Sequence, residues 1–199
     1  MAAAGNMPGA REDAASWTDP SGNLWLYGGT GVGSTSVLGT GSVGTLADVW
    51  KYSPATNEWT WMSGPNVMYD GSNPNPTPVY GTEGVAAAGN TPGYRGEFGW
   101  AGDANGNLWL YGGGGDSPMG DLWKYSTETN EWTWMSGPQT ADETGTSGVY
   151  GTEGVPAASN IPTSRFQPAL WIDATGNLWL FGGTELYTGL NDLWQYQIN

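Results

Sequence analysis

One long sequence motif occurs three times in the chain, and the third copy is incomplete. Asn-Leu-Trp-Leu-(Tyr/Phe)-Gly-Gly stands at Asn23–Gly29, Asn107–Gly113 and Asn177–Gly183. Each copy is followed by Asp-(Val/Leu)-Trp-(Lys/Gln)-Tyr, at Asp48–Tyr52, Asp121–Tyr125 and Asp192–Tyr196. The first two copies continue into Thr-Asn-Glu-Trp-Thr-Trp-Met-Ser-Gly-Pro, at Thr56–Pro65 and Thr129–Pro138. The sequence ends at Asn199, before a third such phrase, so we expect one repeat array whose third unit is completed by another polypeptide segment.

Each unit predicts four short antiparallel strands joined by hairpins. In the second unit, the strands are expected at Glu97–Asp103, Leu108–Tyr111, Leu122–Ser126 and Glu131–Ser136. Leucine and aromatic residues alternate along these segments, as in a strand with two different faces. Asn105-Gly106 between the first two strands predicts a hairpin with a primed turn, because glycine readily supplies a positive φ. Glycine and proline are too frequent for long helices.

Both faces of such a unit are apolar or aromatic, so a unit cannot be stable alone and must stack against its copies. Stacking around an axis gives a β-propeller. An open solenoid is the main alternative, but a unit of roughly 70 residues is long for one coil of a β-helix. We divide the array into a first unit over residues 1–64, a second over 65–137 and a third over 138–199.

The order of Arg, strand, Gly-Gly, Asp-x-Trp-x-Tyr and Thr-Asn-x-Trp resembles the kelch repeat. The Trp-Thr-Trp-Met-Ser-Gly phrase and the Tyr-Gly-Thr-Glu-Gly-Val connector resemble bacterial kelch proteins related to the central domain of galactose oxidase. The resemblance implies an all-β propeller of four-stranded antiparallel blades, of which families of this kind have six or seven. This chain would supply three blades, the third without its outer strand. It also implies an extracellular or cell-envelope setting.

Two kinds of segment depart from the simple repeat. The connectors Pro65–Tyr94 and Pro138–Ser164 are long, and they carry the matching phrases Tyr80–Val85 and Tyr150–Val155. Segments repeated so closely are expected to be ordered. The loop from Gly29 to Asp48 is longer than its counterparts and rich in Gly, Ser and Thr, so it is expected to be mobile.

The composition excludes several classes of function. Five basic residues and a net charge of −14 argue against binding to nucleic acid or to an anionic membrane. The sequence has no Cys and no His, which removes disulfides, thiolate chemistry and the commonest general base and metal ligand. Copper chemistry of the galactose oxidase kind needs both residue types. Paired carboxylates could hydrolyse a glycosidic bond without them, but no motif places such a pair, so we predict no catalytic, cofactor or metal site.

Arg11, Arg95 and Arg165 occupy one repeat position before the first strand of each unit. They could form a ring that binds an anion. We favour a structural interpretation, in which each arginine pairs with a repeated acid and fixes geometry. The candidate acids are Glu83 and Glu153 of the connectors, or the series Asp48, Asp121 and Asp192. The glycine pairs that end the second strands are also structural positions: Gly28, Gly29, Gly112, Gly113, Gly182 and Gly183.

The 13 tryptophans could stack on sugars, but most repeat in every unit and are expected to pack between units. Residues that break the repeat are better ligand candidates: Tyr69, Asp70 and Tyr187. Asp19, Asp103 and Asp173 resemble calcium-loop residues only superficially, because the closing bidentate glutamate is absent. A hairpin turn explains them without a metal.

The leading hypothesis is therefore a non-catalytic scaffold whose chains associate with each other, two chains closing six blades. The alternatives are a carbohydrate-binding or glycan-processing propeller of a secreted protein, or an engineered or excised fragment of a longer array. The expected partner is a second copy of the chain, with another protein or a glycan as further candidates.

Overall fold

The structure is a computed structural model that describes residues 5–33, 43–69, 77–141 and 148–198. Within these ranges the chain forms 14 strands and no helix, and therefore no helix that could cross a membrane. The strands form four antiparallel sheets of three or four strands. The prediction of an all-β protein built from small antiparallel sheets is confirmed.

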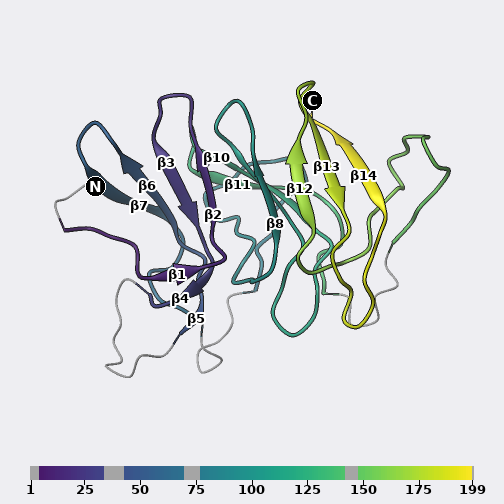
Figure 1. Ribbon diagram of the computed structural model, residues 1–199, viewed down its shortest axis with the longest axis horizontal. Coiled ribbons are helices and arrows are strands. Elements are labelled where there is room, and N and C mark those ends of the chain that lie inside the picture. The colour runs from purple at the N-terminus through teal and green to yellow at the C-terminus, as the bar shows by residue number, and fades with distance from the viewer. Residues whose placement is uncertain (1–4, 34–42, 70–76, 142–147, 199) are drawn as a thin grey trace.

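Three larger sheets correspond to the three repeats and follow one another in chain order along the long axis (Figure 1). The first sheet contains β2 (Ala15–Thr18), β3 (Leu24–Tyr27), β6 (Val49–Ser53) and β7 (Glu58–Ser63). The second contains β8 (Gly99–Gly102), β9 (Leu108–Tyr111), β10 (Leu122–Ser126) and β11 (Glu131–Ser136). The third contains β12 (Ala169–Ile172), β13 (Asn177–Phe181) and β14 (Leu193–Gln197).

The predicted bounds of the second unit hold for three strands, whereas its first strand is shorter than expected. Glu97 has φ 56°, a left-handed conformation that does not fit a strand, and β8 begins only at Gly99. Asp13 and Gln167 adopt the same conformation at the equivalent positions, with φ 54° and 49°. This repeated left-handed residue had no signal in the sequence, because its identity differs in every unit.

The hairpin turn between the first two strands of each unit is not the expected primed turn. Within this turn of the second unit, Gly106 alone has a positive φ, at 83°, and its N–H donates to the carbonyl of Asp103 at 3.0 Å. The N–H of Asp103 donates to the carbonyl of Asn107 at 2.9 Å, which closes a loop of three residues. This is the turn in which one left-handed glycine forms a bulge. The Asp103 carboxylate stabilises this turn by accepting hydrogen bonds from the backbone N–H groups of Asn105 and Asn107.

A fourth small sheet joins β1 (Arg11–Glu12), β4 (Thr30–Gly31) and β5 (Gly44–Thr45). The last two strands lie in the loop that the sequence predicted to be mobile, so that prediction is wrong for both ends of the loop. β4 pairs with β1, and β5 pairs with β4, and these pairings supply the hydrogen bonds that order the two strands. The middle of the loop, residues 34–42, lies outside the described residues.

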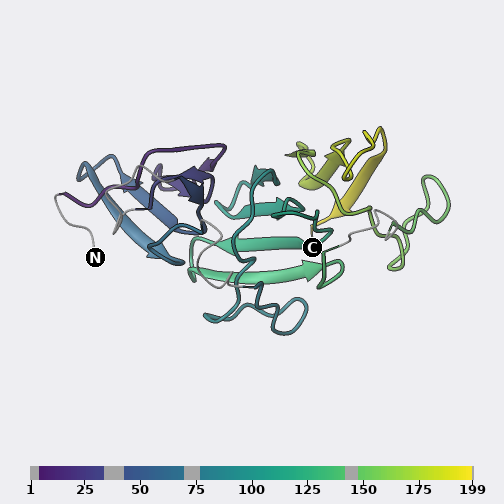
Figure 2. The ribbon, with the colours of Figure 1, turned by 90° about the horizontal axis from the view of Figure 1, so that it is seen from below.

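The large sheets are stacked face to face (Figure 2). Aromatic side chains pack between them. Between the first and second sheets, Trp17 and Trp25 stack at 5.9 Å and both contact the edge of Tyr125. Gly102 of β8 leaves the space for Trp17, because a Cβ there would lie 2.9 Å from the Trp17 Cβ. Between the second and third sheets, Trp109 lies 6.0 Å from Tyr196. Burial of the tryptophans Trp25, Trp50, Trp109 and Trp123 at 4% exposure or less confirms that repeated aromatics form the core.

The repeated parts of the connectors, residues 77–94 and 148–164, are ordered, as predicted, whereas residues 70–76 and 142–147 lie outside the described residues. Val79 pairs with Thr91, and Val149 pairs with Ile161, through isolated bridges at equivalent positions. The first connector also pairs with the outer strand of the second sheet, through Ala87 and Trp132. A connector therefore covers the edge of the sheet that follows it in the chain.

Candidate functional site

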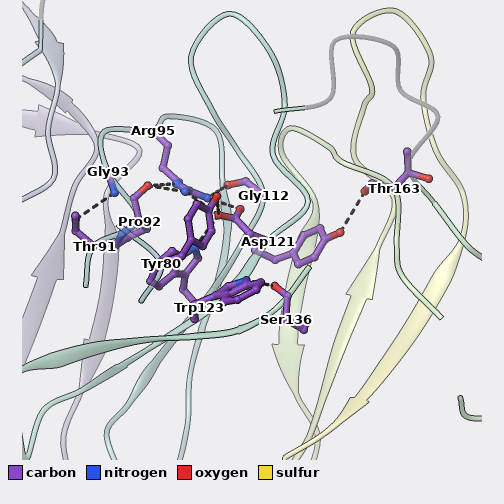
Figure 3. Close-up of polar contacts among 12 residues, drawn as sticks. Tyr80, Thr91, Pro92, Gly93, Arg95, Gly112, Asp121, Trp123, Ser136 and Thr163 are labelled. Atoms are coloured by element: carbon purple, nitrogen blue, oxygen red, sulfur yellow. Dashed lines mark hydrogen bonds and ion pairs between the residues drawn. The ribbon is translucent and has the colours of Figure 1, made fainter. Parts of the chain in front are cut away.

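The second unit contains a buried ion pair between Arg95 and Asp121, and Tyr80 and Trp123 lie beside it (Figure 3). Arg95 precedes the left-handed Glu97, and Asp121 stands directly before β10, so the fold brings them together across 26 residues. The guanidinium contacts the Asp121 carboxylate with both terminal nitrogens, at 2.6 and 3.0 Å. The two side chains are 1% and 0% exposed.

Every N–H of the Arg95 guanidinium has an acceptor within the chain. Besides Asp121, the Pro92 carbonyl accepts from Nε at 3.0 Å and from one terminal nitrogen, and the Gly112 carbonyl accepts at 3.2 Å. Burial disfavours the charged guanidinium, but the Asp121 carboxylate beside it holds the pKa of Arg95 above its ordinary value. With its donors filled by protein oxygens, Arg95 offers none to an external anion.

The same pair recurs in the other two units. Arg11 and Asp48 meet at 2.6 Å with side chains 5% and 1% exposed, and Arg165 and Asp192 meet at 2.6 Å with side chains 0% and 13% exposed. Each arginine also donates to the carbonyl of the first glycine of the Gly-Gly pair: Gly28, Gly112 and Gly182. The structure therefore brings the arginine, aspartate and glycine positions of each repeat into one cluster.

The Gly-Gly pair is required by close backbone approach as well as by conformation. All six of its glycines have positive φ. A Cβ at Gly113 would lie 2.4 Å from the carbonyl oxygen of Gly96, and one at Gly112 would lie 2.5 Å from that of Arg165. The N–H of Gly113 donates to the same Arg165 carbonyl at 2.9 Å, which ties the second unit to the third.

The connector tyrosines are members of the cluster that the sequence analysis missed. The hydroxyl of Tyr80 donates to Asp121 at 3.0 Å, and that of Tyr150 donates to Asp192 at 2.7 Å. Tryptophan indoles donate to the same oxygens, at 2.7 Å from Trp123 and 2.6 Å from Trp194. The repeated Tyr-Gly-Thr-Glu-Gly-Val motif was the available signal, but only its glutamate was predicted to contact an arginine.

Glu83 and Glu153 are exposed, and the three arginines pair with the aspartates instead. Of the ligand candidates, Tyr69 is half-buried, pairs with Thr45 and lies 5.9 Å from the ring of Tyr94. Tyr187 is 97% exposed. Asp70 lies outside the described residues. The structure does not bring Tyr69 and Tyr187 into one site, since Tyr69 pairs with a strand of the first unit and Tyr187 belongs to the third unit.

The hairpin aspartates act as internal braces of the turns. Asp103 accepts from the backbone N–H groups of Asn105 and Asn107, from the Asn107 amide and from the indole of Trp109. Asp173 is held alike, and the hydrogen bond from Trp179 is the main reason that its pKa lies well below the ordinary value. Among the described residues, no group of three or more acidic side chains is placed to hold a metal ion.

A cavity of about 240 Å³ lies where the first and second units meet. It is lined by the connector residues Ala88–Tyr94 and by the turn into β11. Glu131 is the only charged residue among its described lining residues.

The two outer faces of the stack are the larger exposed features. The third-sheet outer face, defined by Trp171, Trp179, Phe181 and Leu193, has Trp171, Phe181 and Leu193 at 42%, 45% and 55% exposure. The first-sheet outer face is defined by Leu24, Leu26, Tyr52 and Trp59, and Leu24 is 46% exposed. Exposed apolar surface of this kind is a candidate interaction site.

No protein-family model matches the chain, and no curated protein matches it.

Stability is expected to fall as the pH rises above about 10. Burial raises the pKa of Tyr125 to about 12, and burial also raises those of Tyr27, Tyr80 and Tyr111 well above the ordinary value. In the unfolded chain these hydroxyls ionise near pH 10. Between the two values the unfolded state binds fewer protons, so the free energy of unfolding falls by up to ~1.4 kcal/mol per pH unit for each tyrosine. Urea unfolding from about pH 9 to 11 measures this slope.

Tyr125→Phe removes one of these groups and should make the alkaline slope shallower. A free energy of unfolding that stays level across this range would contradict the prediction.

Proposed function

We propose that this chain is a kelch-type propeller segment that acts as a non-catalytic scaffold and assembles with a second copy of itself. In this arrangement two chains meet head to tail and close a ring of six blades. The proposal draws on three sheets that stack face to face in chain order. It also draws on the two apolar outer faces that the stack leaves exposed.

The observation that carries the proposal is the match between these two faces and the interface already present inside the chain. Within the chain, Trp17 and Trp25 of the first sheet pack on Tyr125 of the second. The repeat equivalents of Trp17 and Trp25 are Trp171 and Trp179, which stack at 6.3 Å with an interplanar angle of 8°. The repeat equivalent of Tyr125 is Tyr52, on the first-sheet outer face.

A head-to-tail contact would therefore repeat an interface that this sequence already forms. Placing the third-sheet outer face of one copy on the first-sheet outer face of another buries both exposed surfaces at once. Because the two surfaces differ, the contact is heterologous, and such contacts close into a ring when the rotation fits. The net charge of −14 makes two chains repel each other. Because salt screens this repulsion, association should become stronger when salt is added.

Sedimentation velocity and native mass spectrometry over a range of chain concentrations test the proposal. The wild-type chain should reach the mass of two chains. Trp171→Gln/Phe181→Gln on one face and Leu24→Gln/Tyr52→Gln on the other should each weaken association by about tenfold or more, since ~1.4 kcal/mol corresponds to a factor of ten. Glutamine leaves the net charge unchanged. Tyr187→Gln, at a side chain 97% exposed and outside both defined faces, is the control and should associate as wild type.

Mixing the two face variants tests the head-to-tail geometry. Each variant keeps one intact face, and the two intact faces are of opposite kinds, so the mixture should form a mixed dimer that neither variant forms alone. A contact between two identical faces would not be restored in this way. A wild-type chain that keeps the mass of one chain at every concentration, while unfolding cooperatively, would refute the self-association.

A glycan-binding role is the second candidate, because Trp171 and Trp179 present a stacked, partly exposed pair of rings on one face. Aromatic rings in this arrangement offer a broad apolar platform. A glycan array combined with a hydrolysis screen distinguishes the two roles. Glycan binding that disappears in Trp171→Gln/Phe181→Gln would favour the glycan-binding role. Negative results in both the array and the hydrolysis screen would exclude that role.

A further inference from the structure

The second sheet shows how a connector holds the outermost strand of a sheet. The connector segment 79–91 lies against β11, where the N–H of Gly84 donates to the Trp134 carbonyl at 2.8 Å. The amide nitrogen of Asn90 donates to the Trp132 carbonyl at 3.0 Å. The ring of Tyr80 meets that of Trp134 at 5.4 Å. The strand is thus held between β10 on one side and the connector on the other.

The equivalent segment beside the third sheet, 149–161, has the same internal hydrogen bonds. Val155 donates to Thr152 at 3.0 Å, as Val85 does to Thr82 at 3.0 Å. The Asn160 side chain donates to the Val155 carbonyl at 3.0 Å, as Asn90 does to Val85 at 3.0 Å. The φ angles of Gly151 and Gly154 are 63° and 73°, against 62° and 75° for Gly81 and Gly84. The segment therefore adopts the conformation that holds a strand in the second sheet.

No strand among the described residues lies between this segment and β14. Tyr150 is consequently 54% exposed, whereas Tyr80 is 8% exposed. The side-chain oxygen of Asn160 is buried without a hydrogen-bond partner among the described residues. An edge strand such as β14, with a preformed segment beside it, is a site where a further strand can be added.

We propose that β14 and segment 149–161 form a strand-binding slot for an extended peptide of the sequence type Glu-Trp-Thr-Trp-Met-Ser. The peptide adds antiparallel to β14 as the fourth strand of the third sheet. Its register follows that of β11 on β10, where Trp134 faces Trp123 and Trp132 faces Tyr125. The second tryptophan of the peptide accordingly faces Trp194, and the first faces Tyr196.

Two aromatic contacts make the slot selective for this pattern. In the second sheet, Trp132 is 4% exposed and contacts Tyr27 and Tyr125. The equivalent side chains for the first peptide tryptophan are Tyr111 and Tyr196. The second peptide tryptophan meets Tyr150, whose ring already lies 4.9 Å from Trp194. Because the segment is preformed, binding does not have to order it, which lowers the entropic cost.

The test uses the full chain and a fluorescently labelled peptide of sequence Thr-Asn-Glu-Trp-Thr-Trp-Met-Ser-Gly-Pro, followed by fluorescence anisotropy. Saturable binding is expected. Alanine in place of the second peptide tryptophan, or Tyr150→Ala in the chain, should weaken it by about tenfold or more. Asn160→Asp keeps the shape but removes the amide donor, and should also weaken binding. Tyr187→Ala is the matched tyrosine control and should bind as wild type.

Hydrogen exchange locates the bound peptide. Alternate amides of Leu193–Gln197, those that do not already bond to β13, should gain protection when the peptide is added, because they enter a new ladder of hydrogen bonds. The inference is overturned if binding is not saturable, if a peptide of shuffled sequence binds equally well, or if Tyr150→Ala has no effect. Protection of β14 that rises with chain concentration in the absence of peptide would show that a second copy covers the edge instead.

The slot does not depend on the proposed self-association. Its aromatic contacts face the second sheet, whereas the head-to-tail contact uses the opposite face of the third sheet. Trp171→Gln/Phe181→Gln should therefore bind the peptide as the wild-type chain does. Loss of peptide binding and loss of dimerisation are thus separate results.

Discussion

Arg95→Met should lower the free energy of unfolding by about 3–5 kcal/mol, because it leaves the Asp121 carboxylate buried without its cation. Asp121 is 0% exposed, so water cannot replace the lost guanidinium without opening the cluster. The hydrogen bonds from Tyr80 and Trp123 remain, but neither carries a positive charge. Urea denaturation followed by tryptophan fluorescence measures the loss.

Arg165→Met provides the matched comparison for this prediction. Its partner Asp192 is 13% exposed and can be rehydrated, so the loss should be smaller than for Arg95→Met. The double variant Arg95→Met/Asp121→Asn removes the lone charge while keeping an oxygen for Trp123 and Tyr80, and should recover part of the stability. Equal losses for the two arginines, or no recovery in the double variant, would contradict the account of an uncompensated buried charge.

Trp109→Ala is expected to cost about 3–5 kcal/mol, the range for deleting a buried aromatic side chain. Trp109 is 1% exposed and packs between the second and third sheets against Tyr196. The same change at Trp179, its repeat equivalent, should cost about 1 kcal/mol or less, since that ring is on an outer face. Both indoles donate to the aspartate of their hairpin turn, at 3.0 and 2.7 Å, so the pair isolates the packing between sheets.

Chemical denaturation at a concentration where the chain has the mass of one monomer is the measurement for this pair. Association would cover Trp179 and raise its cost, so dilution matters. Similar losses at the two positions in the monomer would mean that the stacked sheets contribute less than their buried aromatics indicate.

The strands could be predicted because their signals are local. Leu108–Tyr111 alternates between leucine and aromatic residues over four positions, and the turns before and after it are rich in asparagine and glycine. The prediction failed where a contact between distant segments overrides local composition. Thr30–Gly31 lies in a Gly/Ser/Thr-rich loop, yet pairing with Arg11–Glu12 makes it a strand.

The ion pairs show the same limit. Repetition in the sequence marked the arginines as structural and supplied two series of acids as partners. It could not choose between Glu83 and Asp121, because the choice depends on where the connector lies relative to β10. Tyr80 was overlooked because its role exists only once the connector has folded back onto Asp121, 41 residues away.

The sequence by itself determined the repeating unit and its periodicity, since strands, turns and repeats are all recognised from residues that are neighbours in the chain. Tertiary structure decided which copies of one residue are buried. Trp109 and Trp179 stand at the same repeat position in nearly the same phrase, yet one lies between two sheets and the other on an outer face. Burial depends on the neighbour across the interface, and that neighbour is not encoded in the unit itself.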